Sequence, residues 1–174
     1  MAAHPKTGQV WELPTFLPIG KDAQGRERRA LLVNPAFPAG PGEYSSKYTF
    51  YWVGVWDGSS RKWTPDDTEP RLLDYGERFT GPSGMVDDKG RSLAFTIAQD
   101  RRSEQGHYDS GWAHNAGLPI VLSQREDGDL AFTPVAEVAN LHDGAALVNI
   151  SSPTSVSDAT LSSPRSRETC STSS

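Results

Sequence analysis

Hydrophobic residues along the chain occur in short runs of aromatic and β-branched side chains, and Gly, Pro, Asp and Asn interrupt these runs. The 3.6-residue spacing of an amphipathic helix is nearly absent. Short apolar runs bounded by turn residues are typical of β-strands. The pattern predicts strands at residues 29–34, 48–56, 71–73, 84–86, 92–98, 120–124 and 130–133.

The segments between these runs carry residues that tight hairpin turns require. Asp57-Gly58, Lys89-Gly90 and Asp127-Gly128 each place a glycine where a turn needs a positive φ. Repeated short strands joined by such turns indicate an all-β fold. A sandwich, a barrel and a propeller all fit this pattern.

Two segments differ from the rest of the chain. Residues 100–115 are polar and contain few β-formers, which predicts a long loop of the kind that often carries function. In residues 151–174, 14 of the 24 side chains are Ser or Thr, too few apolar groups to build a core. We therefore expect the ordered unit to end between residues 141 and 150.

Composition excludes several classes of protein. The formal net charge of −5 argues against a nucleic-acid surface, which needs clustered Lys and Arg. No apolar run approaches the roughly 18 residues that span a bilayer, and the first residues resemble no signal peptide. The single cysteine, Cys170, cannot form an internal disulfide or a cysteine-based zinc site.

Two acidic positions are candidates for chemistry. Glu12 lies between Trp11 and Leu13, two residues before Pro14. One hypothesis is that these neighbours partly desolvate its carboxyl group, which would raise the pKa toward the range of a general acid. The alternative is a solvated Glu at a strand end. Asp74, in Asp74-Tyr75-Gly76, either presents a carboxylate at a sheet rim or forms an ordinary turn.

The polar segment offers a third candidate. His107, Asp109 and His114 are metal-ligand types, but their spacing fits no standard site, and we expect no metal. Trp112 is either a platform for a flat sugar face or a side chain anchored in the core. The sequence has neither a Gly-x-Ser-x-Gly elbow nor a glycine-rich phosphate loop, and we expect no cofactor.

Several stretches form an ordered set of motifs along the chain. They include Trp11-Glu12-Leu13-Pro14-x-Phe16-x-Pro18, Tyr51-Trp52-Val53-Gly54-x-Trp56-Asp57-Gly58, Leu73-Asp74-Tyr75-Gly76-x-x-Phe79-x-x-Pro82 and Gly111-Trp112-Ala113. In this order they resemble glycoside hydrolase family 32, the invertases, levanases, inulinases and related β-fructofuranosidases. The resemblance covers roughly residues 10–142.

The resemblance implies a five-bladed β-propeller, of which residues 1–145 would form about the last three blades, and a disordered Ser/Thr-rich tail at 146–174. It also implies retaining hydrolysis of fructosyl bonds in sucrose or fructans by two carboxyl groups, without a cofactor. By the same resemblance, Glu12 matches the acid/base. Asp74 and Trp112 match substrate-binding positions.

The departures from the family pattern limit this expectation. The Asn-Asp-Pro motif of the nucleophile and the Arg-Asp-Pro motif of the transition-state stabiliser do not occur in the sequence. We therefore expect an incomplete catalytic domain that is inactive alone and that either pairs with a missing N-terminal half or self-associates. The alternatives are a non-catalytic carbohydrate-binding remnant and a structural β domain. The sequence leaves the localisation open.

Overall fold

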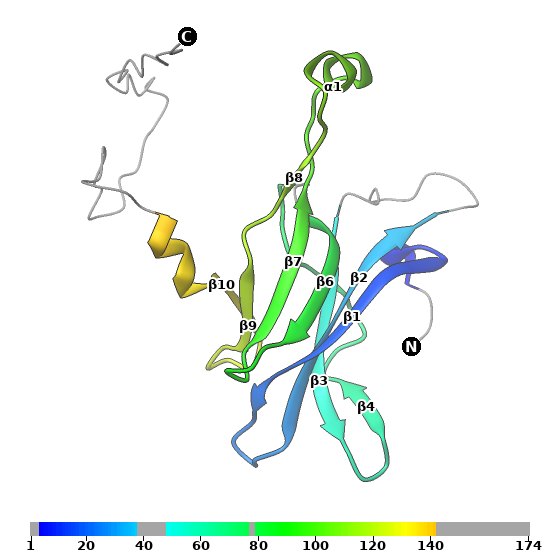
Figure 1. Cartoon of the computed structure of the whole chain (residues 1–174). Helices are drawn as coiled ribbons and strands as arrows, with labels where there is room; N and C mark the ends of the chain where they lie inside the picture. The colour runs from blue at the N-terminus through cyan, green and yellow to red at the C-terminus, as the bar shows by residue number, and fades with distance from the viewer. Residues whose placement is uncertain (1–3, 38–47, 77–78, 142–174) are drawn as a thin grey trace, which may run out of the picture. The chain divides into compact units, whose positions relative to one another are not determined.

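The computed structural model describes residues 4–37, 48–76 and 79–141, and these residues form two antiparallel sheets (Figure 1). A short 3₁₀ helix, η1 (Pro5–Thr7), precedes the first sheet. That sheet has the order β1-β2-β3-β4, and β5 pairs with the start of β3. Its strands are β1 (Val10–Lys21), β2 (Glu27–Ala36), β3 (Phe50–Asp57), β4 (Lys62–Pro65) and β5 (Arg71–Leu72).

The second sheet has the order β6-β7-β9-β10, and the short β8 pairs with the end of β7. The chain between β7 and β8 leaves the sheet and carries the helix α1 (Figure 1). A 3₁₀ helix, η2 (Ala136–Leu141), follows the last strand. The elements are β6 (Phe79–Val86), β7 (Ser92–Ala98), α1 (Glu104–Ser110), β8 (Asn115–Ala116), β9 (Ile120–Gln124) and β10 (Leu130–Pro134).

The prediction of a mostly β protein is confirmed, and two elements differ from the sequence-based expectation. The segment expected to be a loop contains α1, which Ser103 caps by accepting a hydrogen bond from the Gly106 N–H. Gly111 ends this helix in the left-handed conformation, at φ 73°. The pattern also missed the twelve-residue β1, which contains two prolines. The register irregularity between Glu12 and Thr15 leaves Pro14 out of the paired residues, whereas Pro18 pairs with Arg29 just before a second irregularity.

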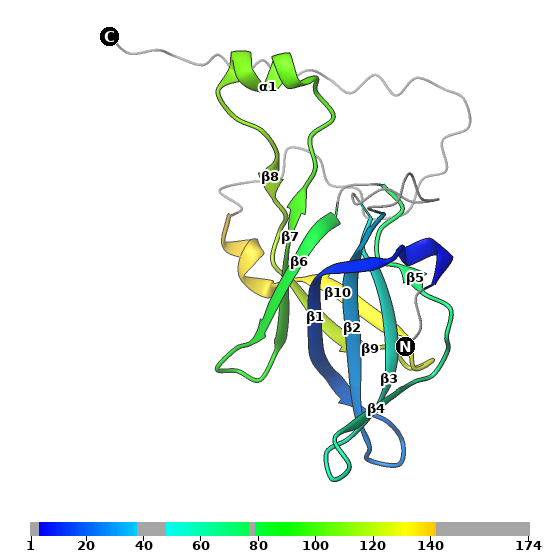
Figure 2. The ribbon, with the colours of Figure 1, turned by 90° about the vertical axis from the view of Figure 1, so that its right-hand side faces the viewer.

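One face of each sheet packs against the other sheet, and alternate residues along the strands supply this shared core. Figure 2 shows β1 and β6 side by side where the two sheets meet. The first sheet contributes Leu17, Ile19, Ala30, Leu32, Tyr51 and Val53, and the second contributes Ala94, Ile120, Leu122 and Leu130. All of these residues are buried.

The two outer faces differ. On the first sheet, Val33, Phe50 and Trp52 form a second buried cluster, covered by partly buried side chains that include Trp11 and Trp63. On the second sheet, Phe95 and Ile97 are 40% and 42% exposed. In the described part of the chain, the first sheet therefore covers much of its own outer face, whereas the second leaves apolar side chains in solvent.

The expectation of about three blades is not met by the described residues, which form two sheets. The reason is that the runs at 29–34, 48–56 and 71–73 all join one sheet, since β5 adds to the edge of β3. The expected disordered tail at 146–174 lies outside the described residues. Among the described helices, none is long and apolar enough to cross a membrane.

Candidate functional site

Glu12 lies near the start of β1, opposite Asn34 of β2, at a backbone irregularity. The next residue, Leu13, has φ 52°, a left-handed conformation that is uncommon for a residue with a branched side chain. The register shifts between Glu12 and Thr15, so Leu13 and Pro14 form a bulge. Such bulges re-aim the neighbouring side chain, and the Glu12 side chain is exposed.

Of the two hypotheses for Glu12, the exposed side chain agrees with the solvated carboxyl group near a strand end. Trp11 packs away from Glu12 on the outer face, with its ring centroid 5.2 Å from that of Trp52. Its indole Nε1 donates a hydrogen bond to Thr7 Oγ1 at 3.1 Å. Leu13 is itself 55% exposed. The side chains of Trp11 and Leu13 do not shield the Glu12 carboxyl group, because they point in other directions.

Asn34 connects the two sheets beside Glu12. Its side chain is 2% exposed, and its Nδ2 donates to Thr80 Oγ1. Its Oδ1 accepts hydrogen bonds from the Gly81 N–H at 3.1 Å and from Thr49 Oγ1 at 3.3 Å. The amide thus joins β2 to β6. The sequence analysis missed this residue, and the available signal was a polar side chain directly after the apolar run Leu31-Leu32-Val33.

Asp74 lies at the same end of the first sheet as Glu12. It follows Leu73, whose N–H donates to Thr49 O at 2.9 Å. Thr49 in turn donates through Oγ1 to Phe79 O at 2.6 Å. The structure therefore brings the segment that contains Asp74 next to the residues that contact Asn34. Asp74 itself is half-buried.

Trp112 follows α1 and is not anchored in the core, because it is 50% exposed. The guanidinium carbon of Arg102 lies 3.8 Å from the centroid of its ring, a cation–π contact. The segment with α1 leaves β7 after Ala98, which pairs with Phe79 at the start of β6. Trp112 therefore lies on the segment between β7 and β8, here called the α1 excursion, which extends from one end of the sheets. Glu12 and Asp74 lie at that same end.

Hydrogen bonds and ion pairs organise the base of this excursion. Asp100 accepts from Arg102 Nε at 2.6 Å, and this contact, helped by His107, lowers the pKa of Asp100 to about 2. Arg102 also donates to Ser110 Oγ at 2.6 Å and to Trp112 O at 3.2 Å. The Arg102 side chain is thus held in place from four sides, by Asp100, Ser110, and both the carbonyl and the ring of Trp112.

The histidines of the excursion have protein partners. The His107 and His114 rings lie 5.4 Å apart, and His107 Nε2 is 3.5 Å from Asp100 Oδ2. His114 Nδ1 accepts from the Asp100 N–H at 3.1 Å. Asp109 instead accepts from Gln105 Nε2 at 2.7 Å. Within residues 4–37, 48–76 and 79–141, no three His, Cys, Asp or Glu side chains are placed to hold a metal ion.

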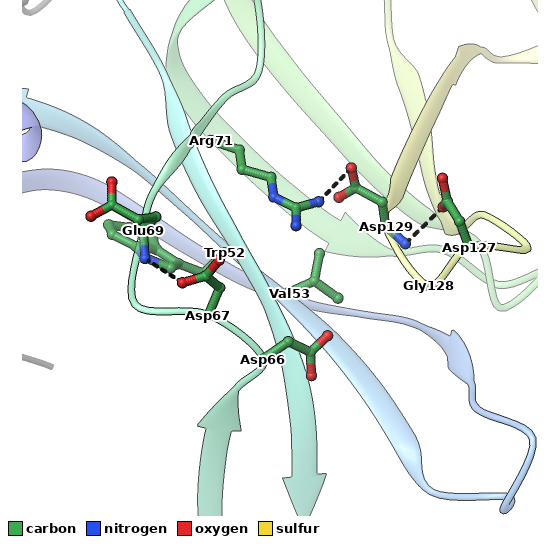
Figure 3. Close-up of a pocket in the computed structure, with 9 residues that line it drawn as sticks. All are labelled: Trp52, Val53, Asp66, Asp67, Glu69, Arg71, Asp127, Gly128 and Asp129. Atoms are coloured by element: carbon green, nitrogen blue, oxygen red, sulfur yellow. Dashed lines mark hydrogen bonds and ion pairs between the residues drawn. The ribbon is translucent and has the colours of Figure 1, made fainter.

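A separate hollow lies between the two sheets, lined by Trp52, Val53, Asp66, Asp67, Glu69, Arg71, Asp127, Gly128 and Asp129 (Figure 3). Asp129 accepts from Tyr51 Oη at 3.1 Å and pairs with Arg71 Nη1 at 2.7 Å. Burial and the neighbouring Asp129 raise the pKa of Tyr51 to about 12. Asp67 and Asp127 each accept from a backbone N–H within their own turns, at 3.0 and 3.1 Å. Through these contacts, the carboxylates stabilise the turns and the packing of the two sheets.

Comparison with known proteins identifies relatives. Residues 1–134 match the family model described as the glycosyl hydrolases family 32 N-terminal domain. The chain is 26% identical over 147 residues to acid beta-fructofuranosidase 4, vacuolar, of Arabidopsis thaliana, covering 79% of this chain and 22% of that protein. It is 26% identical over 168 residues to beta-fructofuranosidase 1 of Zea mays, covering 84% and 25% respectively.

Solved structures show the same fold. Fructan 1-exohydrolase IIa from Cichorium intybus superposes with a TM-score of 0.63 at 20% identity, over 77% of this chain and 26% of that chain. A second structure of that protein holds 1-kestose. The GH32 beta-fructofuranosidase of Bombyx mori gives a TM-score of 0.59 at 19% identity, over 80% and 28%, and a mutant of it was solved with sucrose.

The chain spans about a quarter of the length of these relatives. Its two antiparallel sheets are consistent with part of the catalytic propeller of the family. The family match covers 134 residues, from η1 to the end of β10, and includes Glu12, Asp74 and Trp112. The resemblance found in the sequence motifs is thereby confirmed: the chain belongs to glycosyl hydrolase family 32, of whose N-terminal domain it forms a part.

Proposed function

We propose that this chain carries the acid/base half of a retaining glycosidase site for β-fructosyl bonds in sucrose or fructans. The observation that supports this most directly is the position of Glu12. Its exposed carboxyl group lies next to the bulge near the start of β1, beside the buried Asn34 that fixes β2 against β6. A carboxyl group held on a rigid strand and open to solvent can exchange protons with a bound substrate and with water.

The chemistry assigns one role to each residue. Glu12 protonates the glycosidic oxygen as the fructosyl bond breaks, and then removes a proton from the water that releases the sugar. Asp74, half-buried at the same end, accepts hydrogen bonds from sugar hydroxyls. Trp112 offers its exposed ring to an apolar sugar face.

Retaining hydrolysis also needs a carboxylate nucleophile about 5 Å from the acid/base. The Asn-Asp-Pro motif that carries the nucleophile in this family does not occur in the sequence. We therefore propose that these 174 residues bind saccharide but turn it over only when a carboxylate nucleophile from outside them is present. Relatives in this family bind sucrose and 1-kestose, which makes these the first ligands to test.

The second candidate function is carbohydrate binding without catalysis. The observation that favours it is the fixed side chain of Arg102 on the exposed Trp112, which needs no nucleophile to be useful. The two functions differ in what Glu12 does. A binding remnant tolerates the loss of the Glu12 proton, whereas a glycosidase does not.

The test measures binding and reducing-sugar release together, on sucrose, inulin and levan. It compares the wild-type chain with Glu12→Gln, which keeps the shape of the side chain, and with the control Glu126→Gln in the exposed turn between β9 and β10. Each protein is assayed alone and mixed with the N-terminal part of a family 32 catalytic domain that carries the Asn-Asp-Pro motif. Release in the mixture that Glu12→Gln abolishes and Glu126→Gln retains supports the glycosidase. Binding by all three proteins without release in the mixture supports the binding remnant. Neither binding nor release overturns both functions.

A further inference from the structure

The four main strands of the second sheet contain no charged side chain. No Asp, Glu, Lys or Arg occurs in β6, β7, β9 or β10, whereas β1, β2, β3 and β4 of the first sheet each contain at least one. Exposed strands at the edge of a sheet commonly carry charges that oppose association with another chain. Nothing within these strands of the second sheet provides such opposition.

The outer face of the second sheet is apolar along β7 and its two neighbours. Met85 on β6, Leu93 on β7 and Val121 on β9 form one row, because each pairs with the next across the antiparallel strands. Phe95 and Ile97 continue the face along β7, and Met85, with 54% of its area exposed, is more open than either. These five residues are here called the β7 face. Contiguous apolar surface of this kind marks interaction sites on soluble proteins.

The apolar surface continues from the β7 face to the first sheet. A Cβ atom added at Gly81 of β6 would lie 3.2 Å from Ile97 Cδ1 and 3.5 Å from Leu13 Cδ1, so both side chains lie beside Gly81. Leu13 is exposed. The surface that a partner could cover therefore reaches from β9 across β7 and β6 to the bulge of β1.

The charges around the β7 face allow two copies of the chain to meet there. The chain has a formal net charge of −5, so surfaces that bear its carboxylates repel one another. At the Met85 end of the face, Arg91 pairs with Asp87 at 2.8 Å and with Glu137 at 2.9 Å. Lys89 also pairs with Glu137, at 2.9 Å, so these four charges balance. The β7 face thus offers contact without repulsion between like charges.

Other parts of the chain fit the β7 face less well than a second copy of it does. The outer face of the first sheet is covered by partly buried side chains of its own, which include Trp11 and Trp63. Residues 151–174 are mostly Ser and Thr and offer few apolar groups. A second copy presents an apolar face of the same extent.

We propose that two copies of the chain form a dimer in which their β7 faces pack against each other with the strands antiparallel. The outward-facing residues of β7 are symmetric about Phe95, with an aliphatic side chain two positions to either side. A twofold axis at Phe95 therefore places Leu93 of one copy against Ile97 of the other. Two sheets packed in this way lie about 10 Å apart, the spacing of a β-sandwich.

The α1 excursion favours the antiparallel arrangement over the parallel one. It extends from one end of the sheets (Figure 2) and carries the carboxylates of Glu104 and Asp109. Parallel packing would bring the excursions of the two copies to the same end, where these carboxylates would repel one another. Antiparallel packing places the excursions at opposite ends of the dimer.

Sedimentation velocity of the full 174-residue chain over a range of concentrations measures the oligomeric state. We expect the wild-type chain to form a concentration-dependent dimer. Phe95→Glu places a carboxylate from each copy at the twofold axis, and their repulsion should weaken dimerisation by about tenfold or more. Phe132→Glu is the matched control, because Phe132 is 46% exposed but pairs with the buried Leu122, on the other face of the sheet. This control should dimerise like the wild type, and circular dichroism verifies that both variants are folded.

A pair of opposite charges tests the antiparallel orientation. Leu93→Glu and Ile97→Lys should each weaken dimerisation, because each places a charge against an apolar side chain of the other copy. The double variant should recover most of the loss, since the carboxylate of one copy then meets the ammonium group of the other. A double variant that dimerises no better than the two separate losses predict would overturn the antiparallel arrangement.

Three results would overturn the dimer itself. They are a wild-type chain that stays monomeric up to its solubility limit, an equal loss of dimer in Phe95→Glu and Phe132→Glu, and open-ended aggregates, because a twofold contact closes on itself. A monomeric chain that instead binds the N-terminal part of a family 32 catalytic domain, in a manner that Phe95→Glu disrupts, would assign the β7 face to another polypeptide and reject the second copy. Glu12-dependent release is measured separately, so the dimer and the proposed function can fail independently.

Discussion

Asn34 lies directly opposite Glu12 in the β1–β2 pair, and its buried amide bonds to β6 of the other sheet. The exposed carboxyl group and the buried amide are therefore adjacent parts of one structure. One faces solvent and the other holds the two sheets together. The position of the candidate acid/base depends on a side chain that itself never reaches the substrate.

Replacing Asn34 with Ala should destabilise the fold by about 3 kcal/mol, because it removes the acceptor of the Gly81 N–H and one partner of each of two threonine hydroxyl groups. Urea unfolding followed by circular dichroism measures this loss. The control Asn115→Ala removes an exposed amide and should change stability by less than about 0.5 kcal/mol. Equal stabilities of the two variants would show that the Asn34 network contributes nothing.

Leu13→Gly should relieve the left-handed backbone at the bulge beside Glu12. A leucine at positive φ costs roughly 1–2 kcal/mol that glycine does not pay. Leu118 is a suitable comparison, since it is 49% exposed against 55% for Leu13 and has an ordinary φ. We expect Leu13→Gly to be more stable than Leu118→Gly by about 1 kcal/mol or more in thermal unfolding. The opposite order would show that the bulge is not strained.

Gly54→Ala tests the close approach of β3 and β4. An added Cβ would lie 2.6 Å from Pro65 Cα, a backbone atom that cannot move alone. We expect a loss of more than about 2 kcal/mol and a change in the fluorescence of Trp56 and Trp63, which pair across these strands. Gly58→Ala is the control because its Cβ would meet only Trp56 Nε1 at 3.7 Å, and it should behave like the wild type.

The contact of Tyr51 with Asp129 predicts a stability that falls at both ends of the pH scale. Burial and Asp129 raise the pKa of Tyr51 to about 12, so its contribution is complete below about pH 10 and is lost as the pH rises toward 12. Burial opposes ionisation of Asp129, but the Leu130 N–H, Tyr51 and Arg71 lower its pKa. The contribution of Asp129 is therefore present above its ordinary pKa of 3.8 and is lost in more acidic solution.

Melting temperatures measured across the pH range test this prediction. Tyr51→Phe should lose less stability than the wild type between pH 10 and about 12, because phenylalanine has no proton to release. The control Tyr75→Phe replaces a tyrosine that is 84% exposed and should follow the wild-type curve. Parallel alkaline curves for wild type and Tyr51→Phe would rule out the linkage.

The sequence predicted the strands that alternate cleanly and missed the elements that do not. The observed β7 and β9 have the predicted bounds, and more and less buried positions alternate along each strand. Pro14 conceals β1, because it lies in a bulge that no local pattern reveals. The seven-residue α1 is too short for a helical period, and only its caps at Ser103 and Gly111 mark it.

The sequence motifs singled out candidate site residues but did not predict their environment. Ordered motifs singled out Glu12, Asp74 and Trp112, and the family match covers all three. The exposure of Glu12 was not predictable, because it depends on a bulge that turns Leu13 aside. Asn34 was missed because its partners lie 46 and 47 residues further along the chain.

The strand order of the two sheets has a consequence for the order of folding. Both sheets are built mainly from hairpins of strands that follow one another along the chain, so most of their pairings need only short loops to close. The bonds between the sheets instead close loops of 46 residues at Asn34 and 67 residues at Thr15. Longer loops cost more entropy to close and slow the step that forms them. We therefore expect the hairpins to form first and Glu12 to reach its final place beside β6 only in the last docking step.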